Sequence, residues 1–262
     1  MASPRTVPSS RLASSFPALQ NRGGKAGAKT RMLAVLISAF ALLPFELQSL
    51  DITAHTESGR SVVLARVEKD VTMVEISCHD MGLTLEDPVV DIRGLAELED
   101  LQELKFYYVP QIISYRFLNA CTSLKRLLIS FGRVRSIDFL SAMPELIALH
   151  IEFSNDWESE HGLPFTTEPI DLSANNTLEY LAFRICGLQR VPVFVKVPGS
   201  LRYVDLSYNL PVIGEQDEAA LDSLKTVEQV ILAGAAGGTF GGRYGNLVFA
   251  DTGSIYGEYF GE

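Results

Sequence analysis

The chain has 262 residues, 47% of them hydrophobic and 21% charged, which is ordinary for a soluble globular protein and leaves room for a sizeable core. The net charge is −10, but residues 1–49 hold six of the 22 Lys and Arg residues and one of the 32 acidic residues, so residues 50–262 carry 16 basic and 31 acidic side chains. This acidic body argues against nucleic acid or an anionic membrane as the main partner and favours a protein or peptide, including a basic one.

Residues 1–49 have the features of a targeting sequence. A positively charged leader precedes the apolar run 32–45, MLAVLISAFALLPF, and a polar stretch ending in Ser49 follows it. This order is typical of a secretory signal peptide, and the run is shorter than the about 20 apolar residues of a membrane-spanning helix. We therefore expect a secreted, periplasmic or cell-surface protein. Two alternatives stay open: an uncleaved N-terminal membrane anchor and an organelle-targeting peptide, since the leader is long and rich in Ser and Arg.

A repeated apolar pattern occupies residues 71–233. About seven segments have a large apolar residue at their first, fourth and sixth positions, and they start 30, 23, 22, 32, 23 and 26 residues apart. The segments are VTMVEI (71–76), LQELKF (101–106), LKRLLI (124–129), LIALHI (146–151), LEYLAF (178–183), LRYVDL (201–206) and VEQVIL (227–232). The third and fifth units share four further apolar offsets, at Val134, Ile137, Leu140 and Met143 and at Leu188, Val191, Phe194 and Val197.

This pattern resembles the leucine-rich repeat, L-x-x-L-x-L-x-x-N/C-x-L, and its shorter units are most similar to the 22-residue repeats of bacterial internalins. The ninth position, which carries Asn or Cys in that family, matches only at Asn209 and Cys186; the other units have His79, Val109, Gly132, Ser154 and Ala235. We expect irregular loops where the match fails, because that side chain hydrogen-bonds loop backbone in the family.

The resemblance implies an α/β leucine-rich-repeat solenoid, with short parallel strands on the concave face and irregular or short helical returns. Stacked parallel units bury their apolar rows in one core, which a single short strand cannot do. A β-sandwich is the alternative, but it does not explain the shared offsets. We expect residues 50–70 to form an N-terminal cap with a hairpin around Ser58-Gly59. The Gly-rich segment 234–262 is expected to be a loosely ordered tail or an irregular cap.

No catalytic, metal or cofactor motif is found in the sequence. Cys78, Cys121 and Cys186 form no CxxC pair and are expected to be buried free thiols. The histidines form no HExxH, the glycines form no phosphate-binding loop, and no GxSxG occurs. An insertion at 154–171, which contains Trp157 and His161, is expected to be a solvated loop that contacts a partner.

The family's ligands usually lie against the concave sheet, between the core leucines. This rule predicts a ligand-binding strip, expected to be exposed, in which Tyr side chains stand among charged ones: Tyr107, Tyr108, His150, Tyr180, Arg184, Tyr203, Asp205 and Tyr208. Phe131 and Phe153 face either the ligand or the core. The expected function is a non-catalytic protein-interaction module, exported or on the cell surface. A membrane-anchored structural or adhesive surface protein is the alternative, and an enzyme is disfavoured.

Overall fold

The structure, a computed structural model, describes residues 49–154, 169–209, 212–236, 243–251 and 253–261, which belong to one compact unit, 47–262. The expected signal sequence and the part of the insertion that holds Trp157 and His161 lie outside the described residues. Within the described ranges, no helix is long and apolar enough to cross a membrane.

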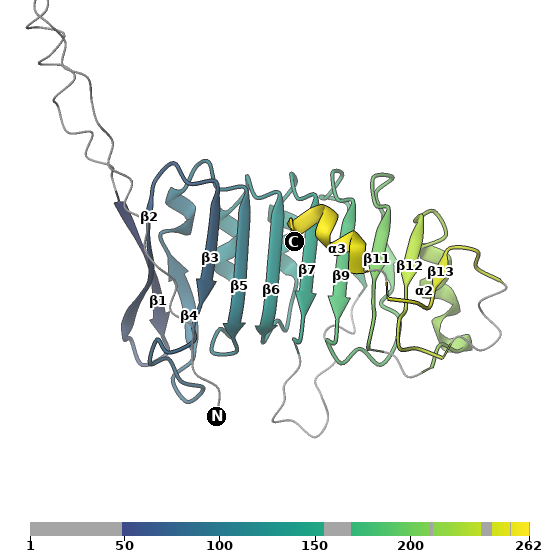
Figure 1. Ribbon diagram of the computed structural model, residues 1–262, viewed down its shortest axis with the longest axis horizontal. Coiled ribbons are helices and arrows are strands. Elements are labelled where there is room, and N and C mark those ends of the chain that lie inside the picture. The colour runs from purple at the N-terminus through teal and green to yellow at the C-terminus, as the bar shows by residue number, and fades with distance from the viewer. Residues whose placement is uncertain (1–48, 155–168, 210–211, 237–242, 252, 262) are drawn as a thin grey trace, which may run out of the picture. The chain divides into compact units, whose positions relative to one another are not determined.

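The main sheet has eight parallel strands in the order β13-β12-β11-β9-β7-β6-β5-β3 (Figure 1). They are β3 (Met73–Ser77), β5 (Glu103–Val109), β6 (Arg126–Gly132), β7 (Ala148–Glu152), β9 (Tyr180–Arg184), β11 (Tyr203–Asp205), β12 (Gln229–Ile231) and β13 (Leu247–Val248). Strand pairing aligns the fourth positions of all seven expected units, from Val74 to Val230. A mostly parallel sheet with few helices agrees with the expected leucine-rich-repeat-like α/β fold. It does not agree with the alternative, an antiparallel β-sandwich.

The repeated apolar positions form the main core behind this sheet. Of the 21 first, fourth and sixth positions, 20 are buried in a single cluster, and Val71 packs partly buried against it. Leu104, Leu127, Leu149 and Leu181 have no exposed surface. Because equivalent residues lie side by side in a parallel sheet, each unit extends its neighbour's apolar row, and the stacked units bury together what one strand would leave in water.

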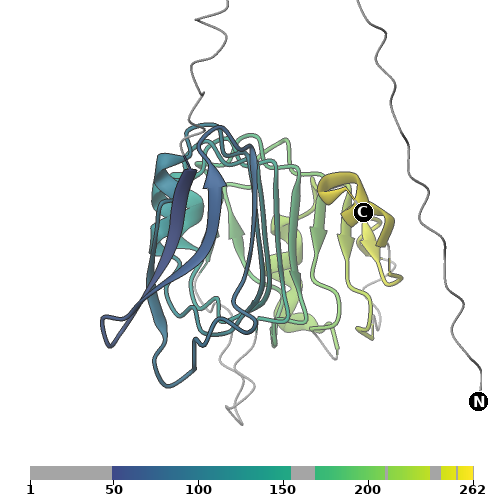
Figure 2. The ribbon, with the colours of Figure 1, turned by 60° about the vertical axis from the view of Figure 1, so that its left-hand side comes forward.

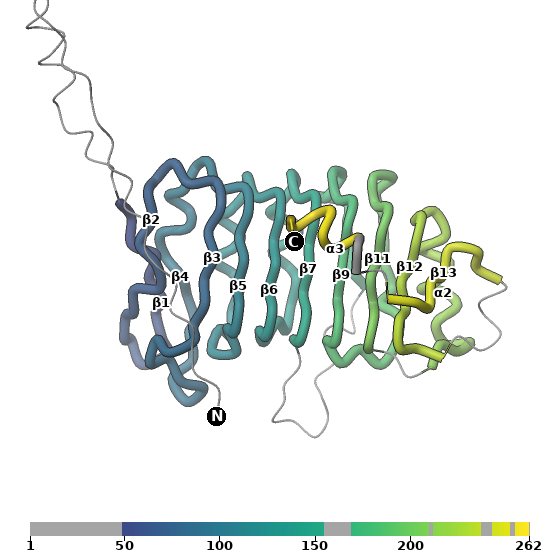
Figure 3. Tube along the Cα trace, viewed as in Figure 1, coloured from purple at the N-terminus to yellow at the C-terminus, as the bar shows by residue number. Residues whose placement is uncertain are grey.

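Short helical turns return the chain from one strand to the next, as the Cα trace in Figure 3 shows. They include the 3-10 helices η1 (Leu95–Glu97), η2 (Arg116–Ala120), η3 (Asp138–Ala142) and η4 (Glu215–Asp217), and the α-helix α2 (Glu218–Ser223). Two further returns carry the short parallel strands β8 (Ile170–Asp171) and β10 (Phe194–Val195). The extra apolar offsets of the third and fifth units, such as Leu140 and Leu188, are buried here and close the core.

The expected hairpin at the start of the unit is present. Strands β1 (Ser49–Thr56) and β2 (Ser61–Glu68) pair in antiparallel fashion around a turn with Gly59 at φ 86°, and β4 (Val89–Arg93) pairs with the other edge of β1. Ile52 and Ala54 are fully buried in the same cluster as the repeat residues. The hairpin thus adds to the core at the β3 end.

The ninth positions are satisfied in different ways. The amide of Asn209 donates to the carbonyls of Phe183, Leu206 and Ser207, and its Oδ1 accepts from the backbone of Cys186. Ser154 Oγ accepts from Val134 N at 2.9 Å. At Gly132 a Cβ would lie 2.6 Å from the hydroxyl oxygen of Tyr115, so a buried aromatic side chain fills the space that Asn occupies elsewhere. The loops are irregular because unrelated side chains support them.

The described residues after 233 form further regular structure. Strand β13 adds to the sheet beside β12, with Tyr244, Leu247 and Phe249 at the first, fourth and sixth positions of an eighth unit. The helix α3 (Gly253–Phe260) then folds back over the sheet (Figure 1). The segment expected to be a loose tail or irregular cap therefore supplies one more repeat strand and a helix. This unit, Y-x-x-L-x-F, is hard to recognise in the sequence because its first position is aromatic and it starts closer to the preceding unit than the other units do.

Candidate functional site

The outer face of the sheet is the face opposite the main core. It carries the third, fifth and seventh residue of each unit, which include most of the predicted ligand-binding strip. Helix α3 lies on this face, while the 3-10 helices of the returns lie on the other side of the strands (Figures 1 and 2). The predicted strip is therefore divided into a part beneath α3 and a part beyond it.

A second apolar cluster joins α3 to the outer face. Ile255 and Phe260 of α3 are buried against a group of strand residues that have little or no exposed surface: Leu128, Ala148, Tyr180, Ala182, Tyr203 and Ile231. The expectation that Tyr180, Tyr203 and His150 are exposed is wrong, since they are 0%, 9% and 1% exposed. The strand phase was predicted correctly, but the distant segment that covers these side chains was not foreseen.

Polar and aromatic contacts fix the position of α3. Lys105 Nζ donates to the carbonyl of Phe260 at 3.2 Å, and the Tyr259 hydroxyl donates to Glu179 Oε2 at 3.1 Å. The rings of Tyr259 and Tyr180 stack with their centroids 5.1 Å apart. A lysine at the C-terminal end of a helix also interacts favourably with the helix dipole.

Asp251 anchors the segment that leads into α3. Its Oδ2 accepts a hydrogen bond from the Tyr208 hydroxyl at 2.8 Å and lies 3.3 Å from a guanidinium nitrogen of Arg184. The same guanidinium group lies 3.7 Å from Asp205. Three residues of the predicted strip, Tyr208, Arg184 and Asp205, are thus brought together, and here they hold the chain's own C-terminal segment.

A buried chain of hydrogen bonds lies beside α3. His150 Nδ1 lies 3.1 Å from the Tyr180 hydroxyl and Nε2 lies 3.4 Å from Glu152, whose other oxygen accepts from Ser130 at 2.9 Å. Burial acts to raise the pKa of Glu152, but its hydrogen bonds to His150 and Ser130 and the positive charge nearby outweigh burial and hold the pKa below its usual value. Burial raises the pKa of Tyr180, so its hydroxyl stays protonated.

This hydrogen-bond chain is not arranged for nucleophilic catalysis. An activated serine must donate to a histidine base, whereas Ser130 donates to the carboxylate of Glu152 and is 2% exposed. The three cysteines are buried free thiols, as expected, and burial raises the pKa of Cys186 to about 12 and of Cys78 and Cys121 to about 11. In the described part of the chain, no group of three or more His, Cys, Asp or Glu residues could hold a metal ion.

An aromatic row follows the ends of the strands, at the eighth position of successive units. We define it as Tyr108, Phe131 and Phe153, whose rings stack with centroids 4.7 and 4.3 Å apart and planes inclined by 8° and 4°. Tyr108 is 53% exposed, and the two phenylalanines are half-buried outside the main core. This settles their orientation: they stack on one another at the edge of the sheet and do not fill the loop core.

Backbone conformation explains the row. The eighth position has φ between +50° and +60° at Tyr108, Phe131, Phe153, Ile185 and Tyr208, and the seventh unit has a glycine there, Gly234, at φ 85°. In this left-handed conformation the chain turns sharply at the end of each strand. Side chains other than glycine adopt it at a cost of about 1–2 kcal/mol each. The in-register stack supplies compensating ring contacts, and the same turn in the second to sixth units places their side chains in a periodic row.

A cavity of about 440 Å³ adjoins the aromatic row. Tyr108 and Phe131 form part of its wall, and the ring of His79 lies 6.1 Å from that of Tyr108. The rest of the lining mixes apolar and polar side chains: Cys78, Asp80, Leu83, Pro110 and Gln111, with Gly82. The cavity gives an aromatic edge a recess into which a partner's side chain could fit.

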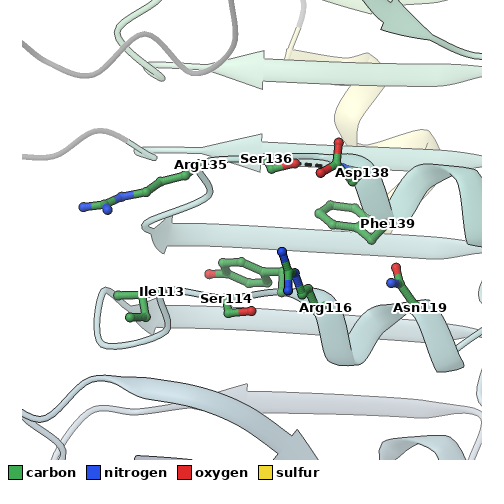
Figure 4. Close-up of a pocket in the computed structure, with 9 residues that line it drawn as sticks. Ile113, Ser114, Arg116, Asn119, Arg135, Ser136, Asp138 and Phe139 are labelled. Carbon is green, nitrogen blue, oxygen red and sulfur yellow. Dashed lines mark hydrogen bonds between the residues drawn. The ribbon is translucent and has the colours of Figure 1, made fainter. Parts of the chain in front are cut away.

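A second cavity, of about 390 Å³, lies between the returns that contain η2 and η3 (Figure 4). Its lining mixes apolar side chains such as Ile113 and Phe139 with charges of both signs from Arg116, Arg135 and Asp138, and the backbone of Asp138 donates to Ser136 Oγ at 3.1 Å. Because cations and an anion share one open hollow, its charges select no single class of ligand.

Comparison with known proteins finds matches among the solved structures. No family model matches the chain, and no curated protein matches it. Among the solved structures that match is an internalin of Listeria monocytogenes, at 17% sequence identity and a TM-score of 0.38. The match covers 65% of this chain and 51% of the internalin, so this chain spans about half the length of that protein.

Proposed function

We propose that the chain is a leucine-rich-repeat solenoid that acts as a non-catalytic protein-interaction module. The sheet supports this proposal because its outer face and strand ends repeat the same side-chain positions in register over eight strands. Such a surface can contact an extended partner at many points while the core behind it stays rigid. The hydrogen-bond chain around His150 does not favour an enzyme, because Ser130 donates to a carboxylate and His150, Ser130 and Tyr180 are 1%, 2% and 0% exposed.

The aromatic row is the observation that carries the proposal. A stack of rings that leaves Tyr108 half-exposed and two phenylalanines half-buried is unusual on a surface that contacts only water, and aromatic side chains beside a recess are typical of binding hot spots. We assign the partner's main contact to Tyr108, Phe131 and Phe153 and to the adjoining cavity. Tyr107 and Tyr208 extend the contact surface, and Tyr208 is 47% exposed.

The partner is a protein or peptide, and the charge of the body favours a basic one. Arg184 and Asp205 lie beside the segment that leads into α3, with side chains only 16% and 7% exposed, so they join the contact only when this segment moves away. His150, Tyr180 and Tyr203 take part only when α3 leaves them uncovered. Nucleic acid is disfavoured because residues 50–262 carry 31 acidic and only 16 basic side chains.

We further propose that the protein is exported and is secreted, periplasmic or held at the cell surface. The support is the order of charge and apolar residues in 1–49. A structural or adhesive surface protein held by an uncleaved anchor is the second candidate, and organelle targeting is the alternative destination. Mass spectrometry of the mature N-terminus separates them: a start near residue 50 supports export with cleavage, and an intact segment supports the anchor.

Binding through the aromatic row can be tested with a matched pair of variants. A partner is captured on the immobilised full chain, and its Kd is measured for the wild type, for Tyr108→Ala/Phe131→Ala and for Val195→Ala, an exposed residue on a return. We expect the double variant to weaken binding by a factor of about 30 or more, since hot-spot residues contribute about 2 kcal/mol or more, and the Val195 variant to bind normally. Equal binding by all three proteins would show that the partner does not bind at the aromatic row.

A further inference from the structure

Helix α3 covers the part of the outer face that is chemically most like a binding site. We infer that α3 is a displaceable cover, and that the surface beneath it binds a partner's short amphipathic helix of the same aromatic chemistry. This inference rests on the proposed function in that the ligand is a protein segment, and it adds the ligand's chemistry and the step that opens the site.

The first support is that α3 stands apart from the main core. Every buried residue of α3 belongs to the second cluster, and none belongs to the cluster that holds the repeats together. Undocking α3 therefore exposes the outer face but leaves the stacked units intact. A segment can leave a folded protein in this way when its loss does not open the core.

The second support is that α3 does not form a stable helix by itself. It has eight residues, GSIYGEYF, two of which are glycine. Isolated helices shorter than about 12 residues are marginal in water, and each internal glycine costs about 1 kcal/mol relative to alanine. The helix thus depends on docking, so undocking and unfolding of this segment are one step.

The third support is the polarity of the surface that α3 covers. His150 and Asp205 are 1% and 5% exposed, and Lys105, Glu103 and Arg184 have side chains that are only 14–16% exposed. A permanent interior disfavours such a concentration of polar and charged side chains even where they pair, as Lys105 does with Glu103 and Arg184 with Asp205, because each loses hydration. A surface that is uncovered part of the time is in water during those periods. Charged side chains ringing an apolar centre are also the usual anatomy of an interface.

The bound α3 shows what the partner must present. Ile255 and Phe260 enter the apolar centre, Tyr256 and Tyr259 lie against His150 and Tyr180, and Glu258 is exposed to solvent. Lys105 donates a hydrogen bond to the Phe260 carbonyl at the end of the helix. The occupant is therefore a helix with apolar or aromatic residues at the spacing i, i+1, i+4 and i+5, which binds in the helix-in-groove mode.

The tether sets the competition between α3 and a partner. Asp251, held by Tyr208 and Arg184, keeps α3 close to its site, and a short tether corresponds to an effective concentration on the order of 1 mM. A free helix at micromolar concentration displaces α3 only if it binds about a thousandfold more tightly or if the Asp251 contacts open first. Partner contact at Tyr208 could release Asp251, which would couple the strand ends to the covered face.

A labelled peptide with the sequence of residues 249–262, FADTGSIYGEYFGE, tests the inference by fluorescence anisotropy. Its binding is measured to the full chain and to the full-length variants Ile255→Asp/Phe260→Asp, Phe260→Ala and Glu258→Gln. We expect the double variant to bind the peptide at least about tenfold more tightly than the wild type, with Phe260→Ala between them and Glu258→Gln like the wild type, because only the first two weaken the tethered competitor.

Two further variants locate the peptide. In the Ile255→Asp/Phe260→Asp background, Ala148→Asp should abolish binding by placing a charge in the apolar centre, and Val193→Ala, at an exposed position on a return, should leave it unchanged. Peptide binding that survives Ala148→Asp, or equal binding by wild type and double variant, would overturn the inference. Loss of cooperative unfolding in both the double variant and Phe260→Ala would also overturn it, since α3 would then be part of the fold. Failure here leaves the test of the aromatic row independent, because the two tests use different residues.

Discussion

The two apolar clusters on either side of the sheet differ in how they are encoded. The main core is built from residues that recur at fixed offsets in every unit, and 20 of its 21 repeated positions are buried. The cluster on the outer face has no repeat: it combines Leu128, Tyr180 and Ile231 from separate strands with Ile255 and Phe260 from the end of the chain. One cluster holds the units together, and the other holds a helix against them.

Because of this difference, the main core determines the stability of the repeats, and the outer cluster determines only whether α3 is docked. A side chain lost from the main core affects neighbouring units on both sides, because the apolar rows are continuous through the sheet. A side chain lost from the outer cluster affects only the docking of α3. The predictions below follow from this contrast, in order of decreasing expected effect.

Leu181→Ala should produce the largest loss of stability. Leu181 has no exposed surface and lies in register between Leu149 and Val204. Removing a buried leucine side chain in a packed core costs about 2–5 kcal/mol. Urea unfolding should show this loss, whereas Val193→Ala, at a 42% exposed position, should change the free energy of unfolding by less than about 0.5 kcal/mol. A small effect at Leu181 would mean that the rows are not continuous.

Asn209→Ala should have the next largest effect. The variant removes an amide that donates to three backbone carbonyls and accepts from Cys186 N at 2.6 Å, so several loop groups lose their partner. We expect a loss of about 2–3 kcal/mol, since unsatisfied buried backbone groups are costly. Asn119→Ala, at an exposed position, is the control for thermal unfolding. An unchanged Tm for Asn209→Ala would show that other side chains can support these loops.

Substitutions in the outer cluster should lower the free energy of unfolding by less, and a second substitution there should add little to the first. Once α3 has undocked, no further loss is possible, so Ile255→Ala/Phe260→Ala should cost little more than Phe260→Ala alone, about 2 kcal/mol at most. Leu127→Ala/Leu181→Ala should instead cost about the sum of the single variants. Double-mutant cycles from chemical denaturation measure both pairs. Additive losses at Ile255 and Phe260 would make α3 part of the main cooperative unit.

The pH dependence tests the polar part of the outer cluster. Because the pKa of Glu152 is lowered in the folded protein, the carboxylate stabilises the fold at pH values above its unfolded pKa, about 4.5, and this contribution is lost as the pH falls below that value. Glu152→Gln should remove this part of the acid sensitivity, by an amount on the order of 1 kcal/mol. Thermal unfolding between about pH 3 and 6 measures it. An identical pH profile for the variant would exclude the Glu152 contribution.

The sequence predicted the parts of the fold that repeat. The phase of each strand follows from apolar residues two positions apart, and the buried free cysteines and the first hairpin follow from local composition and turn residues. Tyr108, Phe131 and Phe153 were all named from the sequence, but whether the two phenylalanines face inward depends on a left-handed backbone conformation, which the sequence does not reveal at residues other than glycine.

The cover over the outer face could not be predicted from the same signals. The contact between α3 and Tyr180 joins residues about 80 positions apart, and it occurs once, so no period reveals it. The glycines of 234–262 also pointed away from ordered structure, although Tyr244, Leu247 and Phe249 repeat the spacing of the earlier units. Exposure of the predicted strip was inferred from strand phase alone, and phase does not show which distant segment packs on a face.

Native-state hydrogen exchange tests the contrast between the two clusters most directly. Backbone amides of residues 255–260 and those of β7 and β9 are compared in the same full-length protein. The account predicts that the α3 amides exchange at least about 100-fold faster than the strand amides, because α3 undocks without opening the main core. Equal protection of both sets would contradict it, since α3 and the repeats would then open only together.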